Sequence, residues 1–307
     1  MSFSTPVLFI TFNRLDTTRQ VFEAIRKVQP ETLYLFSDAG REGKPEEEQQ
    51  VTEVRKWLLE QINWPCQINT LFLDKNMGPR YAIGHAINWL FEQEEAGVIF
   101  EHDCLPHTSF FRFCEELLDK YKNDESVMHI SGNNFLFNEV PFEASYTFTR
   151  HNHIWGFATW KRAWQKYDPE MSGFDEYYKN GCFNELIPNK RIRKEYLSIL
   201  NGVKEGSVDT WDYQWFFNTW YNNGLGVIPA KNLVSNIGYG DLALNTNKAD
   251  HILANIATHE IGEIKQPVTG VKVNKEAERV YLKYVFPPLL YRIRVVNKLL
   301  RQFGLNV

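Results

Sequence analysis

The sequence contains few cysteines, and it lacks a Cys-x-x-Cys pair and an excess of basic residues. Its four cysteines are Cys66, Cys104, Cys114 and Cys182. Their spacing excludes a readable zinc knuckle or dithiol redox motif and favours reduced thiols. A formal net charge of −4 gives no sign of the basic surface that nucleic-acid-binding proteins need, so we expect no nucleic-acid partner.

Long apolar runs and a basic leader are also absent at the N-terminus. The apolar stretch within "MSFSTPVLFITFNRLD" is only about seven residues long, shorter than a signal peptide core with its flanks or a membrane span. We therefore expect a cytoplasmic protein.

The overall composition is typical of a soluble globular protein with the length of many enzymes. Hydrophobic residues make up 43% of the sequence and charged residues 23%, so one large α/β domain or two smaller domains can bury a full core. Aromatic residues reach 15%, with nine Trp. Most of these belong to the core, although exposed clusters can also line sites for ring-shaped ligands.

The first 130 residues alternate between strand and helix patterns. Short β-rich apolar runs at 6–12, 32–38, 67–74, 97–103 and 127–132 predict strands. Apolar residues recurring every three or four positions at 16–28, 45–62, 79–93 and 109–121 predict helices. This order predicts an α/β fold of Rossmann type, with a mostly parallel sheet flanked by helices on both faces.

The pattern changes after residue 145. Aromatic-rich segments at 151–168 and 209–224 are predicted as helices, and short strands such as those within 225–236 flank them. No linker, repeat or low-complexity tract interrupts this region, so we expect one domain over residues 1–260.

Residues 261–307 are predicted to form a C-terminal extension with a basic amphipathic helix. From Arg279 onward there are six basic residues and no acidic side chain. An apolar stripe with basic residues opposite begins after Pro287-Pro288: Leu289, Ile293, Val296, Leu300 and Phe303, facing away from Arg294, Lys298 and Arg301. Two interpretations stay open: a helix resting on the anionic inner face of a membrane, or one docking on its own domain or a second subunit.

Three predicted strands end on carboxylates. They are Asp38, Asp74 and Asp103, the last preceded by Glu101. Ligands bind beyond the carboxyl ends of parallel strands, so the acids mark one edge of the sheet as a candidate site. Each Asp is also a residue type that caps a following turn or helix, which is the alternative for each of them alone.

Two carboxylates in Glu101-His102-Asp103 need a partner, because burying an unpaired charge is costly. Mg²⁺ and Mn²⁺ prefer oxygen ligands and are often shared between one or two protein carboxylates and substrate phosphates. An acid-x-acid pattern is weak by itself, and its position after an apolar strand strengthens it.

Eight segments of the sequence, taken in order, resemble the nucleotide-diphospho-sugar transferases of the GT-A fold. The resemblance is greatest to bacterial members related to the mannoside N-acetylglucosaminyltransferase that starts N-glycan branching, and it spans about residues 5 to 245. The segments are "VLFITFNR", "FSDAGRE", "DKNMGPRYAIGHAINWLF", "VIFEHDCLPHTSFFRF", "HISGNN", "HIWGFATWKRAW", "TWDYQWFFNTW" and "LVSNIGYGD".

The resemblance implies a donor and metal site built on Glu101-His102-Asp103. Asp103 would bind Mn²⁺ or Mg²⁺, and Glu101 would hold the donor ribose or support the metal from behind. His102 stands where relatives often have Asp. The resemblance further places Thr11, Arg14 and Asp38 beside the nucleotide, with Asp38 accepting from the base, and Arg80 facing the diphosphate. The alternative for Arg80 is an ordinary helix-start arginine.

In the second half, the resemblance implies an acceptor site with a general base. Asp212 matches the base position, and Asp209 is the rival that otherwise caps the helix. Trp155 and Gly156 match a segment that lines the pocket, although Trp155 also fits a core position. The loop 235–241 matches one that closes over the donor, and its two glycines suit a hinge.

We therefore expect a metal-dependent, inverting glycosyltransferase that uses a nucleotide sugar, with a UDP-sugar favoured, and a glycan or lipid-linked acceptor. A sugar-nucleotide pyrophosphorylase is one alternative, but "FITFNRLDTT" lacks the Gly-rich loop expected to hold a triphosphate. A non-catalytic nucleotide-sugar or glycan-binding protein is another. A glycoside hydrolase would use two carboxylates but has no need of nucleotide-facing aspartates.

Overall fold

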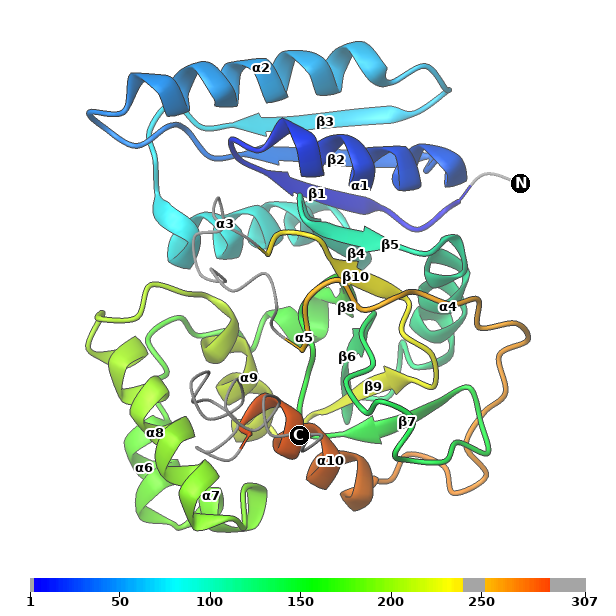
Figure 1. The fold of residues 1–307 in the computed structure, drawn as a ribbon, viewed down its shortest axis with the longest axis vertical. Helices are drawn as coiled ribbons and strands as arrows, with labels where there is room; N and C mark the ends of the chain where they lie inside the picture. Colours follow the sequence, from blue (N-terminus) through cyan, green and yellow to red (C-terminus); the bar gives the residue numbers. More distant parts are fainter. Residues whose placement is uncertain (1–2, 240–251, 288–307) are drawn as a thin grey trace, which may run out of the picture.

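The computed structural model describes residues 3–239 and 252–287, and it has the α/β fold predicted from the sequence (Figure 1). Eight strands form one sheet in the order β3-β2-β1-β4-β8-β6-β9-β7, and β5 pairs with β10 in a small second sheet. The strands are β1 (Val7–Thr11), β2 (Thr32–Ser37), β3 (Gln67–Phe72), β4 (Ala96–Glu101), β5 (Cys104–Pro106), β6 (Val127–Ser131), β7 (Tyr146–Thr149), β8 (Phe157–Trp160), β9 (Leu225–Pro229) and β10 (Val234–Asn236).

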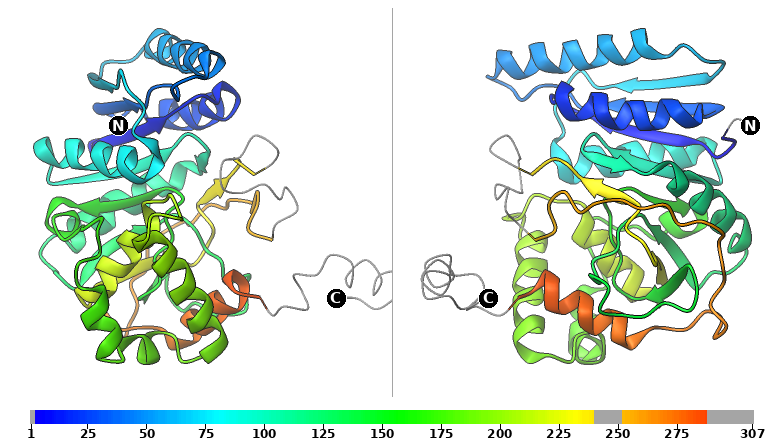
Figure 2. Two further views of the ribbon diagram at one scale, coloured as in Figure 1. Left: turned by 90° about the vertical axis from the view of Figure 1, so that its left-hand side faces the viewer. Right: turned by 45° about the vertical axis from the view of Figure 1, so that its right-hand side comes forward.

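The helices cover the sheet and build a separate layer at one end of the molecule. Figures 1 and 2 place α2 at one end of the long axis and α6, α7, α8 and α10 at the other. The helices are α1 (Leu15–Val28), α2 (Pro45–Gln61), α3 (Gly78–Gln93), α4 (Thr108–Lys120), α5 (Lys161–Trp164), α6 (Phe174–Lys179), α7 (Cys182–Leu186), α8 (Lys190–Lys204), α9 (Asp212–Tyr221) and α10 (Lys275–Val285).

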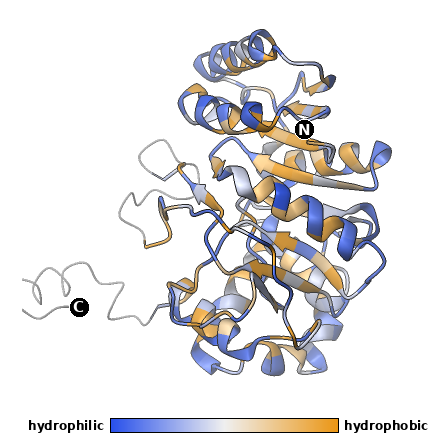
Figure 3. Ribbon diagram, turned by 90° about the vertical axis from the view of Figure 1, so that its right-hand side faces the viewer, coloured by the Kyte–Doolittle hydropathy of each residue, from blue (hydrophilic) through white to orange (hydrophobic). Residues whose placement is uncertain are grey.

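The first half of the chain forms the parallel part of the sheet. Strand β1 lies between β2 and β4 and runs parallel to both, with Phe9 opposite Leu35 on one side and Phe100 on the other. These strands are apolar throughout because helices bury both of their faces, as the hydropathy colouring in Figure 3 shows for the interior strands. All five predicted strands and four predicted helices of this half are present within two residues of their expected ends.

The segment 151–168 is not the helix that its aromatic spacing predicted. Phe157–Trp160 forms β8, which is antiparallel to both β4 and β6, and only Lys161–Trp164 is helical. All four β8 residues are buried. A central strand buried on both faces reads as a continuous apolar run, which sequence periodicity does not separate from a buried helix. The prediction for 209–224 is correct for Asp212–Tyr221, which forms α9.

The described part of the C-terminal extension, residues 261–287, packs on the domain. Lys265 and Ser145 exchange hydrogen bonds, and the Asn274 N–H donates to the Phe148 carbonyl. Within α10, Tyr281 stacks between the rings of His151 and His153, at centroid distances of 5.1 and 4.8 Å. Helix α10 is therefore part of the domain core.

The predicted amphipathic stripe from Leu289 to Phe303 lies outside the described residues. Two of the six basic residues of the tail do lie in α10, where Arg279 pairs with Glu276 and Lys283 pairs with Glu139. None of the helices within residues 3–239 and 252–287 has the length and apolar character needed to cross a bilayer.

Candidate active site

The candidate site lies where the parallel strands end. Strand β4 ends at Glu101, and His102 and Asp103 form the turn into β5. Strand β10 then pairs with β5 and places Cys104 opposite Asn236. The Ile237 N–H donates to the Asp103 carbonyl over 2.9 Å, so the segment after β10 lies directly on the turn.

Gly238 fits closely against the Asp103 carboxylate. A Cβ at position 238 would lie only 2.0 Å from the Asp103 Oδ2, so no other residue fits there without a shift. Arg14, which precedes α1, donates from Nη1 to the Gly238 carbonyl over 2.9 Å. The structure thus brings together Arg14 and Asp103, two residues that the sequence predicted for this site.

The pKa of Glu101 is shifted by burial and by two other carboxylates. Burial, with the charges of Asp103 and Asp212, raises the pKa of Glu101 to about 8, while a hydrogen bond from the Trp211 side chain acts in the opposite direction. Because such coupling needs proximity, Asp212 of α9 lies close to the end of β4. Two halves of the chain therefore meet at this point.

His102 is held among charges of both signs. Burial lowers its pKa, the Asp103 and Asp16 carboxylates raise it, and the Arg14 guanidinium lowers it. A neutral His102 leaves the site with a net negative charge from its carboxylates. The arrangement is suited to a cation.

Asp212 is the first residue of α9, and its side chain is oriented through one oxygen. Its Oδ1 accepts hydrogen bonds from the Thr210 hydroxyl and, over 2.9 Å, from the Tyr213 N–H. Both of these bonds are made to Oδ1. No residue within 3–239 and 252–287 donates a hydrogen bond to Oδ2. Burial raises the pKa of Asp212. An oriented carboxylate with a free oxygen and raised basicity has the properties of a general base.

Asp209, the rival candidate for the base, is exposed and lies next to Gly78. Its Oδ2 is 3.5 Å from the point that a Cβ at Gly78 would occupy, so it faces the start of α3. Its charge is not among those that raise the pKa of Glu101. Asp209 does not cap α9, because that helix begins three residues later and Trp211 occupies the capping position.

Trp155 and Gly156 pack against β10 and the residue Tyr239 that follows it. Gly156 has φ +66°, and a Cβ there would lie 3.0 Å from Val234, so both backbone shape and packing require glycine. The Trp155 ring meets the Tyr239 ring edge-on at 5.7 Å. Burial and the Asp103 charge raise the pKa of Tyr239.

Asp38 is a structural residue in this fold. Its carboxylate accepts hydrogen bonds from the N–H groups of Ala39, Met77 and Gly78 and from the Asn76 amide, at 2.9 to 3.2 Å. These bonds fix the turn before α3. They occupy the carboxylate oxygens that were predicted to accept a hydrogen bond from the nucleotide base. Burial raises the pKa of Asp38, and the three backbone donors oppose that rise.

Arg80 and Thr11 are also engaged within the protein. The buried Arg80 guanidinium donates to the carbonyls of Val203 and Pro169, so it ties α3 to α8 instead of facing a diphosphate as predicted. The Thr11 hydroxyl donates to the Phe36 carbonyl over 3.0 Å and joins the ends of β1 and β2. Both residues hold the sheet edge in shape.

Several tyrosines surround Asp212 that sequence reasoning missed. They come from separate segments, so no local pattern predicts their grouping. Burial raises the pKa of each, and the charge of Asp212 adds to the rise: Tyr167, Tyr196, Tyr213 and Tyr281. Together they give Asp212 an aromatic surrounding with hydroxyl groups, a lining suited to a sugar.

The carboxylates fit a metal that a substrate helps to hold. Within the described part of the chain, no three His, Cys, Asp or Glu side chains form a ready-made metal cluster. Mg²⁺ and Mn²⁺ sites often use only one or two protein carboxylates, with substrate phosphates completing the shell. Glu101 and Asp103 supply oxygen ligands whose repulsion a cation would relieve.

No protein-family model and no curated protein match this chain. Among solved structures, an inositol-1-phosphate CTP transferase from T. maritima is 10% identical, with a TM-score of 0.32 over 53% of this chain and 74% of that one. A 4-diphosphocytidyl-2C-methyl-D-erythritol synthase from Anaerococcus prevotii is 10% identical, with 0.33 over 53% and 76%. An apo UDP-glucose pyrophosphorylase is 12% identical, with 0.30 over 53% and 78%. Likenesses this distant carry no argument about the activity of this chain.

Replacing Asp38 by Ala is expected to lower the free energy of unfolding by about 2 kcal/mol, because it leaves several backbone donors without their charged acceptor. Urea denaturation followed by circular dichroism measures the change. Asp74→Ala is the matched control, because Asp74 follows the neighbouring strand and is exposed. Equal stability of the two variants would show that the Asp38 bonds do not matter.

Replacing Asp103 by Asn is expected to raise the thermal stability of the metal-free protein, because it removes a charge that repels Glu101. The same change is expected to abolish stabilisation by Mn²⁺ together with a nucleotide sugar. Thermal melts with and without these additions measure both effects. Retention of the Mn²⁺ effect in Asp103→Asn would contradict a metal-binding role.

Proposed function

We propose that this protein is a metal-dependent glycosyltransferase that moves a sugar from a nucleotide-diphosphate sugar to a hydroxyl acceptor with inversion. One observation supports this most: Asp212, with a raised pKa and a free Oδ2, lies within electrostatic range of the Glu101 carboxylate at the end of β4. Asp212 would then act as a base across from a pair of carboxylates suited to a metal-bound diphosphate.

The reaction would form a bond between the acceptor oxygen and the anomeric carbon and break the bond between that carbon and the diphosphate oxygen. Asp212 Oδ2 would take the proton of the acceptor hydroxyl. Asp103, with Glu101 beside it, would hold a divalent cation. The cation would neutralise the charge of the departing diphosphate. Attack from the side opposite the leaving group inverts the anomeric centre.

The hydrogen bonds to Oδ1 would keep the base in one orientation. With the Thr210 hydroxyl and the Tyr213 N–H on one oxygen, the other would be left for the acceptor hydroxyl. Orientation of this kind is a large part of how a positioned base accelerates a reaction. The tyrosines around Asp212 would exclude water and pack against the acceptor sugar.

Arg14 would contribute on the donor side. Its side chain is mostly buried, with Nη1 on the Gly238 carbonyl and Nη2 on Asp16. A guanidinium at this position offers a second positive group for a diphosphate once the segment at Gly238 shifts. Trp155, beside Tyr239, would form part of the wall of the same pocket.

Nucleotidyl transfer, as in a sugar-nucleotide pyrophosphorylase, is the main alternative, since such an enzyme shares the α/β layout and the divalent metal. The chain between β1 and α1, Phe12-Asn13-Arg14, contains no glycine to bring backbone N–H groups around a triphosphate. That reaction also has no use for a base at Asp212. A non-catalytic sugar-binding role is the other alternative, and it predicts donor binding without turnover.

A thermal-shift screen of UDP-, GDP-, CMP- and dTDP-sugars with and without Mn²⁺ would identify the donor, with a UDP-sugar favoured. Slow hydrolysis of the stabilising donor then separates a transferase from a binding protein. Release of pyrophosphate from UTP and a sugar phosphate would instead support nucleotidyl transfer.

Asp212→Asn is expected to lower turnover by about 10² to 10⁴, the range for loss of a positioned base, with donor affinity unchanged. Because the base works only when ionised and burial raises its pKa, wild-type activity should fall with decreasing pH above the range of an ordinary aspartate. Donor hydrolysis or transfer rates against pH measure both. Asp209→Asn is the control, and a loss confined to Asp209→Asn would move the role of base to that residue.

We further propose that the tail contacts an anionic membrane surface near a lipid-linked acceptor. Full-length protein is expected to sediment with anionic vesicles at low salt and to be released by high salt, because the contact is electrostatic. The comparison is a chain ending at Pro287, which keeps α10 in the core. Equal sedimentation of both chains would contradict a role for the tail.

A further inference from the structure

A polar groove follows the ends of β6 and β9. Two hollows of about 410 and 500 Å³ make up this groove, and they join because Asn134, Asn138, Ala230 and Lys231 line both of them. Each volume falls in the range of small-molecule sites. The residues that the proposed transfer reaction uses line neither hollow, so the groove is a separate feature of the surface.

The polar groove lies on the same edge of the sheet as the candidate active site. Strand β8 is antiparallel to both β4 and β6, and β9 is parallel to β6, so β4, β6 and β9 all end at this edge. Asn134 follows β6, and Ala230 follows β9. Neighbouring strands lie about 4.8 Å apart, so the intervals from β4 across β8 and β6 to β9 add up to about 14 Å. That distance is the length of several linked sugar rings.

Aromatic contacts connect the polar groove to the candidate active site. Phe135, next to Asn134 in the chain, meets the Trp155 ring edge-on at 5.1 Å. Trp155 in turn meets Tyr239. The Asn134 N–H donates to the side chain of Asn232, which ties the loop after β6 to the loop after β9. A run of contacts therefore links the loops of the groove with the segment after β10.

The polar groove is open, and its polar side chains are free. Asn138, Lys231, His259 and Glu260 are exposed and line it. Within residues 3–239 and 252–287, the side chains of Asn138, Lys231 and Glu260 have no hydrogen-bond or ion-pair partner. With His259 neutral, one lysine and one glutamate leave the lining without net charge. Such a lining favours a neutral polar ligand over a phosphate or a nucleic acid.

Two half-buried phenylalanines give the polar groove aromatic surfaces. Phe142 lines one hollow and Phe137 the other. The Phe137 ring also packs against Tyr284, at a centroid distance of 4.3 Å, so it is held in place. Phe137 and Asn138 both have a left-handed backbone, with φ +47° and +60°. Strain of this kind at a bulky residue is found preferentially at ligand sites, and here it brings an aromatic ring and a free amide to the same hollow.

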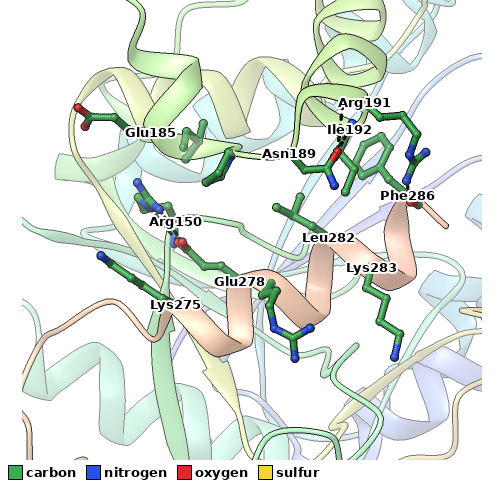
Figure 4. A pocket seen from close by; sticks show the side chains of 13 residues that line it. Arg150, Glu185, Asn189, Arg191, Ile192, Lys275, Glu278, Leu282, Lys283 and Phe286 are labelled. Carbon is green, nitrogen blue, oxygen red and sulfur yellow. Dashed lines mark hydrogen bonds and ion pairs between the residues drawn. The ribbon is translucent and has the colours of Figure 1, made fainter. Parts of the chain in front are cut away.

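The hollow between α7, α8 and α10 has no comparable free lining (Figure 4). Its apolar residues Ile192 and Leu282 are buried. Figure 4 shows Arg150 beside Glu278, and Arg150 donates to both oxygens of that carboxylate. Most of its side chains are thus used within the protein, whereas those of the polar groove are left for a ligand.

We infer that the polar groove binds a chain of neutral sugars, the part of an oligosaccharide acceptor that leads away from the accepting hydroxyl. Sugar rings pack on Phe137 and Phe142, and sugar hydroxyl groups bond to Asn138 and Lys231. An aromatic ring with polar groups around it suits the apolar face and hydroxyl rim of a sugar. The inference rests on the proposed function, because that function places the accepting hydroxyl at Asp212.

A glycan array probed with the full-length protein identifies the oligosaccharides that it binds. Calorimetry then compares a bound oligosaccharide with its terminal monosaccharide. We expect the oligosaccharide to bind about tenfold more tightly or better, because only the longer chain reaches the polar groove. Equal affinity for the two saccharides would overturn the inference, as would an array on which no oligosaccharide is bound.

Asn138→Gly and Lys231→Ala are each expected to weaken oligosaccharide binding about fivefold to tenfold, as for loss of one hydrogen bond, and to leave monosaccharide binding unchanged. Glycine at 138 keeps the left-handed backbone. Asn223→Gly is the matched control for the first, because Asn223 also has a positive φ, +54°, but precedes β9 at the opposite edge of the sheet. Lys272→Ala is the control for the second, because Lys272 is exposed and lines neither hollow. Equal losses in variants and controls would overturn the inference.

Donor hydrolysis separates failure of this inference from failure of the proposed function. Both groove variants are expected to hydrolyse the nucleotide sugar at the wild-type rate, because neither residue belongs to the donor site. Hydrolysis by the wild type without any preference for an oligosaccharide would overturn the inference and leave the proposed function standing. Oligosaccharide binding through the polar groove without any hydrolysis would contradict the proposed function alone.

Discussion

Mutual repulsion of carboxylates at the end of β4 is the constraint around which the rest of this site is arranged. Glu101, Asp103 and Asp212 come from two halves of the chain, and burial, together with the charges of Asp103 and Asp212, raises the pKa of Glu101 to about 8. A fold selected for stability alone would keep such groups apart. The sheet edge instead holds them together, with the Trp211 side chain donating a hydrogen bond to Glu101. Uncompensated charge of this kind is typical of a functional site.

The first half of the fold follows from the sequence, because local rules and packing agree there. Buried parallel strands read as apolar runs, and amphipathic helices between them have one possible arrangement. Strand β8 was not predicted from the sequence, because Phe157–Trp160 takes its strand conformation by pairing with β4 and β6 on either side. The pairing of β5 with β10 could not be predicted from the sequence either, since it joins residues 130 positions apart, such as Leu105 and Ser235.

The candidate site could be predicted in position but only partly in role. Asp38 and Asp103 both follow the ends of parallel strands, as predicted, yet their surroundings differ. Asp38 is surrounded by backbone donors. Asp103 has a glycine backbone and a second carboxylate as neighbours. Only tertiary contacts separate these cases, as they do for Arg80, whose guanidinium is used between α3 and α8.

The position of β8 also bears on how a growing chain would fold. By the time β4 is complete, its outer edge is an apolar strand without a neighbour, and the strand that covers it ends at Trp160, opposite Ala96. At ribosomal rates of about 5–20 residues per second, the sixty or so residues in between take on the order of several seconds to synthesise. An open apolar strand edge pairs readily with other chains. Aggregation during synthesis would therefore begin at β4, before the residues that complete the sheet exist.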